Sequence, residues 1–293
     1  MYYFKTIAEL TELADKKKIS IPEVVILREK ELSEKSEVEI RKCMKQNLKV
    51  MREAIKAGLE SEGLTSMSGL AGGDAKLIDH VHQKGTSLTG EINSQAIARA
   101  LAISEVNAAM GPIVAVPTAG SCGILPAALL TIADKYEKGE EEVIDALFVA
   151  SGIGLVIAQQ ASVSGAEGGC QAECGSAAGM AAGAITYLMG GDSEQIANAI
   201  AISLKNVLGL VCDPVAGLVE IPCIKRNAVG ASNSLVAAEM ALAGIESVIP
   251  VDEVIVAMKK VGDALPNELK ETSLGGLAAT PTACRIKSDL LEG

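Results

Sequence analysis

Five cysteines lie between residues 122 and 223, and each stands in or beside a segment rich in glycine or proline. Thiolates are common ligands of zinc and of iron–sulfur clusters, and loops allow several sulfur atoms to converge on one small site. The spacing is unlike that of a zinc finger, because one pair is four residues apart and another is eleven apart. The pattern therefore favours a metal site without fixing the metal. The five residues are Cys122, Cys170, Cys174, Cys212 and Cys223.

Charged side chains next to these cysteines could carry protons or hold an anionic substrate. In a cluster with three protein ligands the fourth iron stays open, and an open iron can act as a Lewis acid on a substrate hydroxyl and carboxylate. Hydroxide is a poor leaving group without such help. Because most charged residues of a protein are solvated, we expect fewer than half of the following to matter: Glu167, Glu173, Asp213, Glu220, Lys225 and Arg226.

Residues 117–123 are small and stand directly before a predicted helix. Free backbone N–H groups at a helix N-terminus bind carboxylates well, so this loop is a candidate anion site, with an ordinary tight turn as the alternative.

Other motifs carry weaker signals. His80 and His82, the only histidines, would not face the same way on a helix, so a surface or capping role is expected, although either could serve as a general base. The Gly152-Ile153-Gly154 segment lacks the third glycine and the preceding strand of a dinucleotide site. Ser203-Leu204-Lys205 has the form of some pyridoxal-phosphate lysines but lies in the middle of a predicted helix.

Length and charge narrow the class of protein. The chain has 293 residues, 49% of them apolar, which is enough for a large buried core. Its 37 acidic and 26 basic residues give a net charge of −11, so nucleic acid is not an expected partner. The first residues lack the pattern of a targeting signal, and we expect a cytoplasmic protein whose cysteines are not paired in disulfides. Residues 146–158 form a charge-free run of thirteen, too short for a membrane span.

Hydrophobic periodicity predicts an all-α fold. One or two amphipathic helices are expected between residues 22 and 58, followed by a Gly/Ser-rich loop over residues 64–74 that could border a site. Ser94 is the predicted N-cap of a helix that ends at Met110, and residues 113–116 are a short β-branched run suited to a strand. Further helices are predicted over residues 126–136, 140–162, 175–189, 192–207, 225–243 and 252–262, with Asp192 and Asp252 as caps.

Three long segments around the cysteines resemble the α chains of the iron–sulfur-dependent L-serine dehydratases, and the likeness runs over nearly the whole chain. They read Pro-Thr-Ala-Gly-Ser-Cys-Gly-Ile-Leu-Pro-Ala at 117–127, Ser-Gly-Ala-Glu-Gly-Gly-Cys-Gln-Ala-Glu-Cys-Gly at 164–175, and Cys-Asp-Pro-Val-Ala-Gly-Leu-Val-Glu-Ile-Pro-Cys at 212–223. The resemblance implies a charged helical segment at residues 1–60 before a single large helical catalytic domain at residues 61–293, whose Gly-rich loops converge on a [4Fe–4S] cluster. It also implies an L-serine ammonia-lyase, which forms pyruvate and ammonia by β-elimination of water with cluster iron as Lewis acid.

The resemblance sorts the cysteines as well. The family's ligand positions match Cys170, Cys212 and Cys223, whereas Cys174 stands where other members carry a residue that is not a ligand. Cys122 is likewise not expected to bind the cluster.

The resemblance bears on partners and substrate contacts too. Single-chain relatives carry an extra domain that completes the active site, so we expect a separate β chain, which could supply the general base, and an oligomeric assembly. Thr118, Ser121 and Ser164 are the expected contacts to L-serine. Some relatives place a C-terminal cysteine on the fourth iron, but Cys284 is nine residues before the end and is not assigned to the cluster.

Two other functions stay open. The first is a lyase of the same superfamily that removes sulfide from L-cysteine. The second is a subunit without catalytic activity, in which a metal only holds two loops together.

Overall fold

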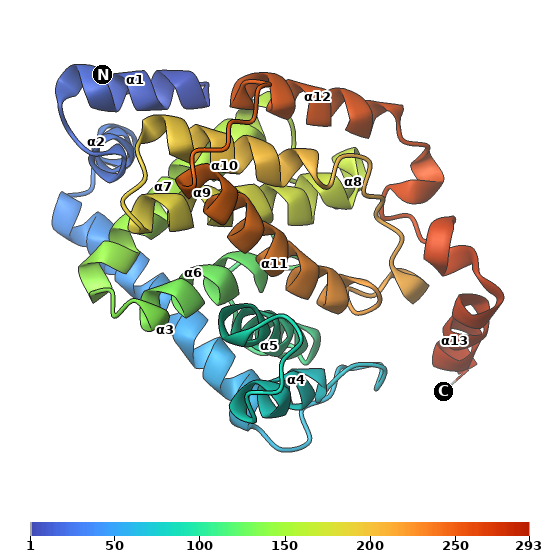
Figure 1. Ribbon diagram of the computed structural model, residues 1–293. Helices are drawn as coiled ribbons and strands as arrows, with labels where there is room; N and C mark the ends of the chain where they lie inside the picture. The colour runs from blue at the N-terminus through green and yellow to red at the C-terminus, as the bar shows by residue number, and fades with distance from the viewer. Residues whose placement is uncertain (1, 293) are drawn as a thin grey trace.

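The computed structural model describes residues 2–292, and its regular structure is helical (Figure 1). Over these residues the only pairing of β type is an isolated bridge between Cys212 and Lys270. The prediction of an all-α fold is therefore confirmed. No helix in this part of the chain is long and apolar enough to cross a membrane.

The six helices predicted between residues 126 and 262 are present, with ends displaced by at most two residues. The α-helices are α1 (Ile7–Lys17), α2 (Ile21–Ser33), α3 (Glu37–Glu60), α4 (Asp74–Gln83), α5 (Glu91–Ala108), α6 (Ile124–Lys135), α7 (Glu140–Gln160), α8 (Gly165–Gly168), α9 (Ser176–Leu188), α10 (Ser193–Lys205), α11 (Cys223–Leu242), α12 (Val251–Ala264) and α13 (Pro281–Glu292). The π-helical turn η1 (Gln171–Gly175) precedes α9, and the short 3₁₀ turns are η2 (Val215–Gly217), η3 (Asn267–Leu269) and η4 (Gly276–Ala279).

Helix α9 forms much of the core, and twelve of its thirteen residues are buried. Its many alanines and glycines let α7 and α10 approach closely from two sides. A Cβ at Gly183 would lie 2.4 Å from Ile153 Cδ1 of α7 and 3.0 Å from Ile200 Cγ1 of α10, so a larger residue would not fit. Close packing through small side chains therefore holds the three helices together.

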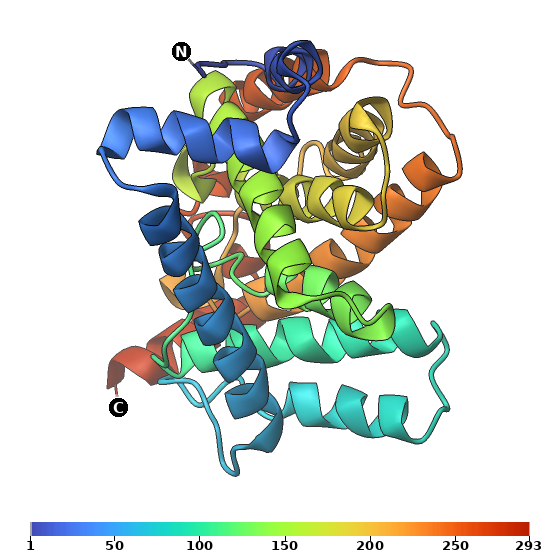
Figure 2. The same cartoon turned by 90° about the vertical axis from the view of Figure 1, so that its left-hand side faces the viewer.

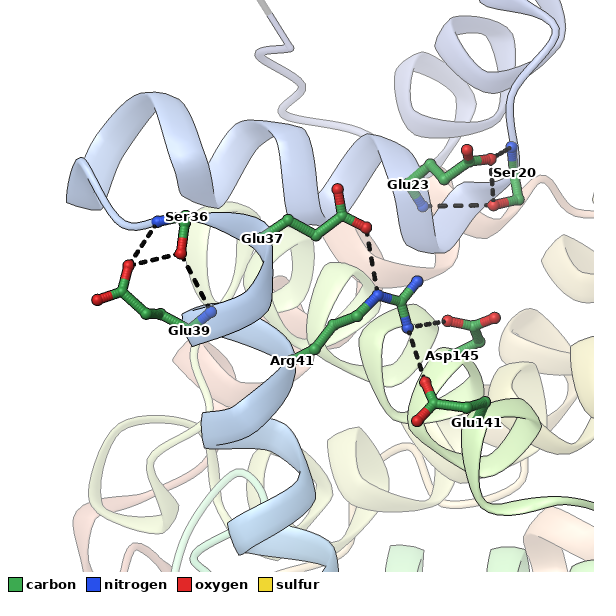
Figure 3. Close-up of polar contacts among 8 residues, drawn as sticks. All are labelled: Ser20, Glu23, Ser36, Glu37, Glu39, Arg41, Glu141 and Asp145. Atoms are coloured by element: carbon green, nitrogen blue, oxygen red, sulfur yellow. Dashed lines mark hydrogen bonds and ion pairs between the residues drawn. The ribbon is translucent and has the colours of Figure 1, made fainter.

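The predicted amphipathic region forms two helices, α2 and α3, and a capping box starts each of them (Figure 3). Glu23 accepts a hydrogen bond from the Ser20 backbone N–H at 2.7 Å, and the Ser20 hydroxyl accepts one from the Glu23 N–H at 3.4 Å. Ser36 and Glu39 repeat the arrangement at 2.9 and 3.3 Å. Each box satisfies backbone donors that the first turn of a helix leaves free.

Arg41 links α3 to α7 (Figure 3). Its guanidinium donates to Asp145 at 2.9 Å and to Glu37 on its own helix at 3.3 Å. Helix α3 then runs along the side of the molecule toward α4 and α5, which lie side by side (Figure 2). Buried Ile26 and Met51 belong to the same hydrophobic core as α7. The division at residue 60 therefore separates segments by charge, while the core is continuous across it.

Three local predictions were wrong. Ser94 does not cap α5, because the helix begins at Glu91 after Gly90, and the Ser94 hydroxyl instead donates to the Glu91 carbonyl at 2.9 Å. Residues 113–116 form no strand, since no other strand is present in residues 2–292 to pair with them. Asp252 does not cap its own helix; it accepts hydrogen bonds from the N–H groups of Ile7 at 2.8 Å and Ala8 at 3.1 Å, and so caps α1.

Candidate functional site

Cys170 lies directly before the π-helical turn η1 and is only 2% exposed. The next residue, Gln171, anchors this turn: its side-chain amide donates to the Met258 carbonyl at 2.9 Å and accepts from the Gly209 N–H at 2.9 Å. Its backbone N–H also donates to the Leu210 carbonyl at 3.0 Å. Irregular turns of this kind occur often at functional sites, because they turn a side chain out of the regular helical register.

The backbone of Cys212 pairs with a segment near the C-terminus of the chain. Its N–H donates to the Leu269 carbonyl at 2.8 Å, and its carbonyl accepts from the Glu271 N–H at 2.7 Å. A Cβ at Gly165 would lie 3.1 Å from Cys212 Sγ, 3.1 Å from Glu271 Oε2 and 3.3 Å from Glu173 Oε2. One thiol and two carboxylates thus surround the small residue that begins α8.

Cys223 is the first residue of α11 and is 8% exposed. Arg226, one turn further on, donates to the Val211 carbonyl at 2.8 Å and to Asp213 Oδ1 at 2.9 Å. Asp213 Oδ2 in turn accepts from the Leu277 N–H at 2.8 Å. These contacts join the start of α11 to the backbone on both sides of Cys212.

The three thiols lie close enough for the charge of one to change the pKa of another. Burial raises the pKa of Cys212, and so do the nearby groups of Cys170, Glu271, Glu173 and Cys223. Burial also raises the pKa of Cys223 to about 12. The pKa of Cys170 is lowered instead, first by a hydrogen bond from the Cys174 thiol and also by the charge of Arg226. Deprotonated sulfur at all three positions would therefore need a cation among them.

A single metal ion does not suit this donor set. Within residues 2–292 no group of three or more His, Cys, Asp or Glu side chains is arranged to hold one ion. A four-iron cluster spreads its ligands further apart, because each thiolate bonds a different iron. Three buried free thiols on separate segments of the chain could each bind one iron of such a cluster. That Cys170, Cys212 and Cys223 hold a [4Fe–4S] cluster stays a prediction.

The predicted substrate loop, residues 117–123, reaches the same region. Thr118 donates a hydrogen bond to Glu173 Oε1, and its hydroxyl lies 3.0 Å from that of Ser121. A Cβ at Gly120 would lie 2.6 Å from Glu173 Oε1, so the loop passes close over this carboxylate. Burial raises the pKa of Glu173, whereas the Thr118 hydrogen bond lowers it. The carboxyl group can therefore retain a proton more readily than an exposed glutamate.

Ser164, the third predicted contact, precedes Gly165 and is half-buried. Its carbonyl accepts a hydrogen bond from the Gly168 N–H at 3.0 Å. Its hydroxyl makes no hydrogen bond that caps α8. It lies next to the site through its neighbour Gly165.

The other charged candidates differ in their exposure to solvent. Glu167 is exposed, and Lys225 pairs with Asp74 at 2.6 Å at the surface. Glu220 is 5% exposed and accepts a hydrogen bond from Ser66 at 2.6 Å. Because Ser66 belongs to the Gly/Ser-rich segment of residues 64–74, that loop does border the region of Cys223.

The four cysteines outside the predicted ligand set lie in different surroundings. Cys122 is 1% exposed, and burial raises its pKa to about 12. Cys174 is buried beside Cys170, while Cys43 and Cys284 are exposed. Cys284 lies on α13 at the edge of the molecule (Figure 1).

His80 is exposed, and His82 lies 3.1 Å from the Ser94 hydroxyl through Nδ1. Both are on α4; the exposed position of His80 agrees with the predicted surface role, whereas His82 is half-buried.

Sequence reasoning missed two side chains of this region. The Glu271 N–H donates to the Cys212 carbonyl, next to the isolated bridge, and Asn227 contacts the loop of residues 117–123 from α11. Neither stands in a motif with a recognisable spacing, so only the folded chain reveals them.

Comparison with known proteins identifies close relatives over almost the full length. The family described as "Serine dehydratase alpha chain" matches residues 16–278. A Bacillus subtilis protein named "Probable L-serine dehydratase, alpha chain" is 52% identical over 290 residues, which cover 99% of this chain and 96% of the relative. The "L-serine dehydratase, alpha chain" of Peptoniphilus asaccharolyticus is 43% identical, with 98% of each chain covered.

A longer relative shows a different chain organisation. The "L-serine dehydratase" of Streptomyces coelicolor is 39% identical over 97% of this chain, but the match covers only 62% of that protein. The family match and the two full-length relatives agree with one another and with the motifs that surround the three cysteines. The chain belongs to the serine dehydratase alpha chain family.

Proposed function

We propose that this chain, together with a β chain, deaminates L-serine to pyruvate and ammonia by β-elimination of water, with a [4Fe–4S] cluster held by Cys170, Cys212 and Cys223. The proposal is supported by three buried thiols on separate segments that act electrostatically on one another and on which the charge of Glu173 also acts. The names of the relatives support L-serine as the substrate and a separate β chain as the partner.

The cluster would supply a Lewis acid, since an iron without a protein ligand can draw electron density from the hydroxyl that leaves as hydroxide. Thr118, Ser121 and Ser164 would orient the amino acid through their hydroxyls. Glu173 is placed to hold a proton at its carboxyl group near this loop, because the burial that raises its pKa outweighs the Thr118 hydrogen bond that lowers it. The elimination yields aminoacrylate and water, and the aminoacrylate then tautomerises and takes up water to release ammonia.

The β chain would complete the site, and it could supply the base that removes the Cα proton. The extra length of the Streptomyces coelicolor relative agrees with this view, since 38% of that protein lies outside the match. An active assembly would therefore contain both chains.

The test is anaerobic preparation of the α chain with its β chain, followed by measurement of pyruvate from L-serine and from L-cysteine. We expect turnover of L-serine, a change in the cluster absorption on its addition, and loss of activity in air. Faster pyruvate formation from L-cysteine would favour a desulfurising lyase. A brown protein without turnover of either amino acid, and with an unchanged spectrum, would contradict the proposal and favour a binding subunit.

A further inference from the structure

Asn227 joins the substrate loop to the helix that carries Cys223. It lies on α11, four residues after Cys223, and is 1% exposed. Its Oδ1 accepts a hydrogen bond from the Gly123 N–H at 2.9 Å. Its Nδ2 donates to the Gly120 carbonyl at 2.7 Å and to the Cys223 carbonyl at 2.9 Å. One carboxamide therefore contacts two points of the loop and the backbone of a candidate ligand.

These partners fix the orientation of the amide. Gly123 presents an N–H donor, whereas Gly120 and Cys223 present carbonyl acceptors. If the amide were rotated, its NH₂ group would face the Gly123 N–H and its oxygen would face the two carbonyls. In the observed orientation both N–H bonds of the side chain are already used. Because the side chain is buried, the loss of these bonds would leave polar groups without water as a substitute.

The loop has no freedom to move toward α5. A Cβ at Gly123 would lie 2.5 Å from the Ala100 carbonyl oxygen and 2.8 Å from Ser104 Oγ, so its backbone already touches that helix. Asn227 holds the loop from the opposite element, α11. The position of the loop between the two helices is thus set by close packing on one side and by hydrogen bonds on the other.

We propose that Asn227 is a positioning residue that fixes the loop of residues 117–123 relative to Cys223, and through the loop sets the affinity for L-serine. The second part rests on the proposed function. Thr118 and Ser121 belong to this loop, and their hydroxyls lie 3.0 Å apart. Side chains that bind a small substrate must be held in place before it arrives, because ordering them afterwards reduces affinity.

Asn233 provides a matched control on the same helix. Its Nδ2 donates to the Ser203 carbonyl at 3.0 Å and hydroxyl at 3.1 Å, and its Oδ1 accepts from Asn206 at 2.9 Å. It therefore makes as many bonds as Asn227, but they join α11 to α10 rather than to the loop. A general loss of helix packing would affect both variants, whereas loss of loop position would affect Asn227→Ala alone.

The first readout is steady-state kinetics of the anaerobic assembly with the β chain. Asn227→Ala should raise KM for L-serine by about tenfold, the equivalent of one to two net hydrogen bonds, at unchanged iron content. Asn233→Ala should leave KM close to that of the wild type. If the wild-type assembly forms no pyruvate, the proposed function fails, and the position of the loop is decided by the second readout alone.

The second readout uses the metal-free chain. Iodoacetamide alkylation of Cys122 and Cys223, followed by peptide mass spectrometry, should be faster in Asn227→Ala than in the wild type, relative to the exposed Cys43. The Asn233→Ala chain should retain the wild-type rates. Equal effects of the two variants, or wild-type alkylation rates in Asn227→Ala, would overturn the proposal, as would an unchanged KM in an active assembly.

Asn227→Asp is the second variant if the alanine chain does not fold. It keeps the volume and the acceptor for the Gly123 N–H, but it places an oxygen against the Gly120 and Cys223 carbonyls. The same two readouts, with the same expected directions, apply to it.

Discussion

Thr118 donates a hydrogen bond to Glu173 across 55 residues of sequence, and this contact joins the substrate loop to the π-helical turn that follows Cys170. Glu173 is half-buried, and the donor partly offsets the cost of removing the carboxylate from water. The loop and the turn therefore form one unit, although the sequence places them far apart.

Replacement of Thr118 by valine should destabilise this unit. Valine has a similar shape but no hydroxyl, so the half-buried Glu173 carboxylate loses a donor and its pKa rises further. We expect a loss of about 1–3 kcal/mol in the free energy of unfolding, measured by urea titration of the metal-free chain. Thr118→Ser keeps the hydroxyl and should lose less. If the valine variant is as stable as the serine variant, the hydrogen bond makes no net contribution to the free energy of unfolding.

The pair of Asp213 and Arg226 should contribute more to stability than an exposed pair. Asp213→Ala removes the partner of a largely buried guanidinium and the acceptor for the Leu277 N–H, which should cost about 3 kcal/mol. The matched change Asp263→Ala removes the partner of Lys259 in an exposed pair on α12 and should have little effect. Urea unfolding of the two variants makes the comparison, and equal losses would contradict it.

Glu105 should give the stability of the chain a distinct pH dependence. Burial raises the pKa of this carboxyl group, against the lowering effect of the Ala75 N–H that donates to it at 3.2 Å. The folded state therefore binds more protons than the unfolded state between the ordinary glutamate pKa and the raised one. Stability from this group is present at low pH and falls as the pH rises through that window.

The variant Glu105→Gln removes this dependence, because its amide oxygen can still accept from the Ala75 N–H without a titrating charge. As the pH rises from the acid range to neutrality, the free energy of unfolding of the variant should increase relative to that of the wild type. Glu239→Gln, at an exposed position on α11, should follow the wild type at each pH. A constant difference between Glu105→Gln and the wild type would refute the assignment.

The sequence predicts the helices well, because their caps and apolar spacing are local. Asp192 caps α10 as expected, through a 2.8 Å bond from the Gln195 N–H. Asp252 shows where local rules fail: it has the form of a cap, yet it serves α1 at the other end of the chain. Its role depends on the contact between distant helices, which no short pattern encodes.

The residues of the site likewise fall into those that motifs indicate and those that only the folded structure reveals. Cys170, Cys212 and Cys223 stand in long motifs, so the sequence alone selects them as ligand candidates. Asn227 and Glu271 act through hydrogen bonds and backbone pairing with segments more than 50 residues away, and nothing in their immediate sequence marks them. Tertiary contacts thus supply the part of the site that motifs do not.

The most direct measurement is the iron and sulfide content of the anaerobically prepared chain, alone and with single cysteine changes. The wild type should carry close to four irons per chain, as a [4Fe–4S] cluster requires. Cys170→Ser, Cys212→Ser and Cys223→Ser should each lose the cluster, while Cys174→Ser and Cys122→Ser keep it. If a variant of Cys170, Cys212 or Cys223 retains the iron content of the wild type, the ligand set is contradicted. If the wild-type chain itself never binds iron, the whole account is contradicted.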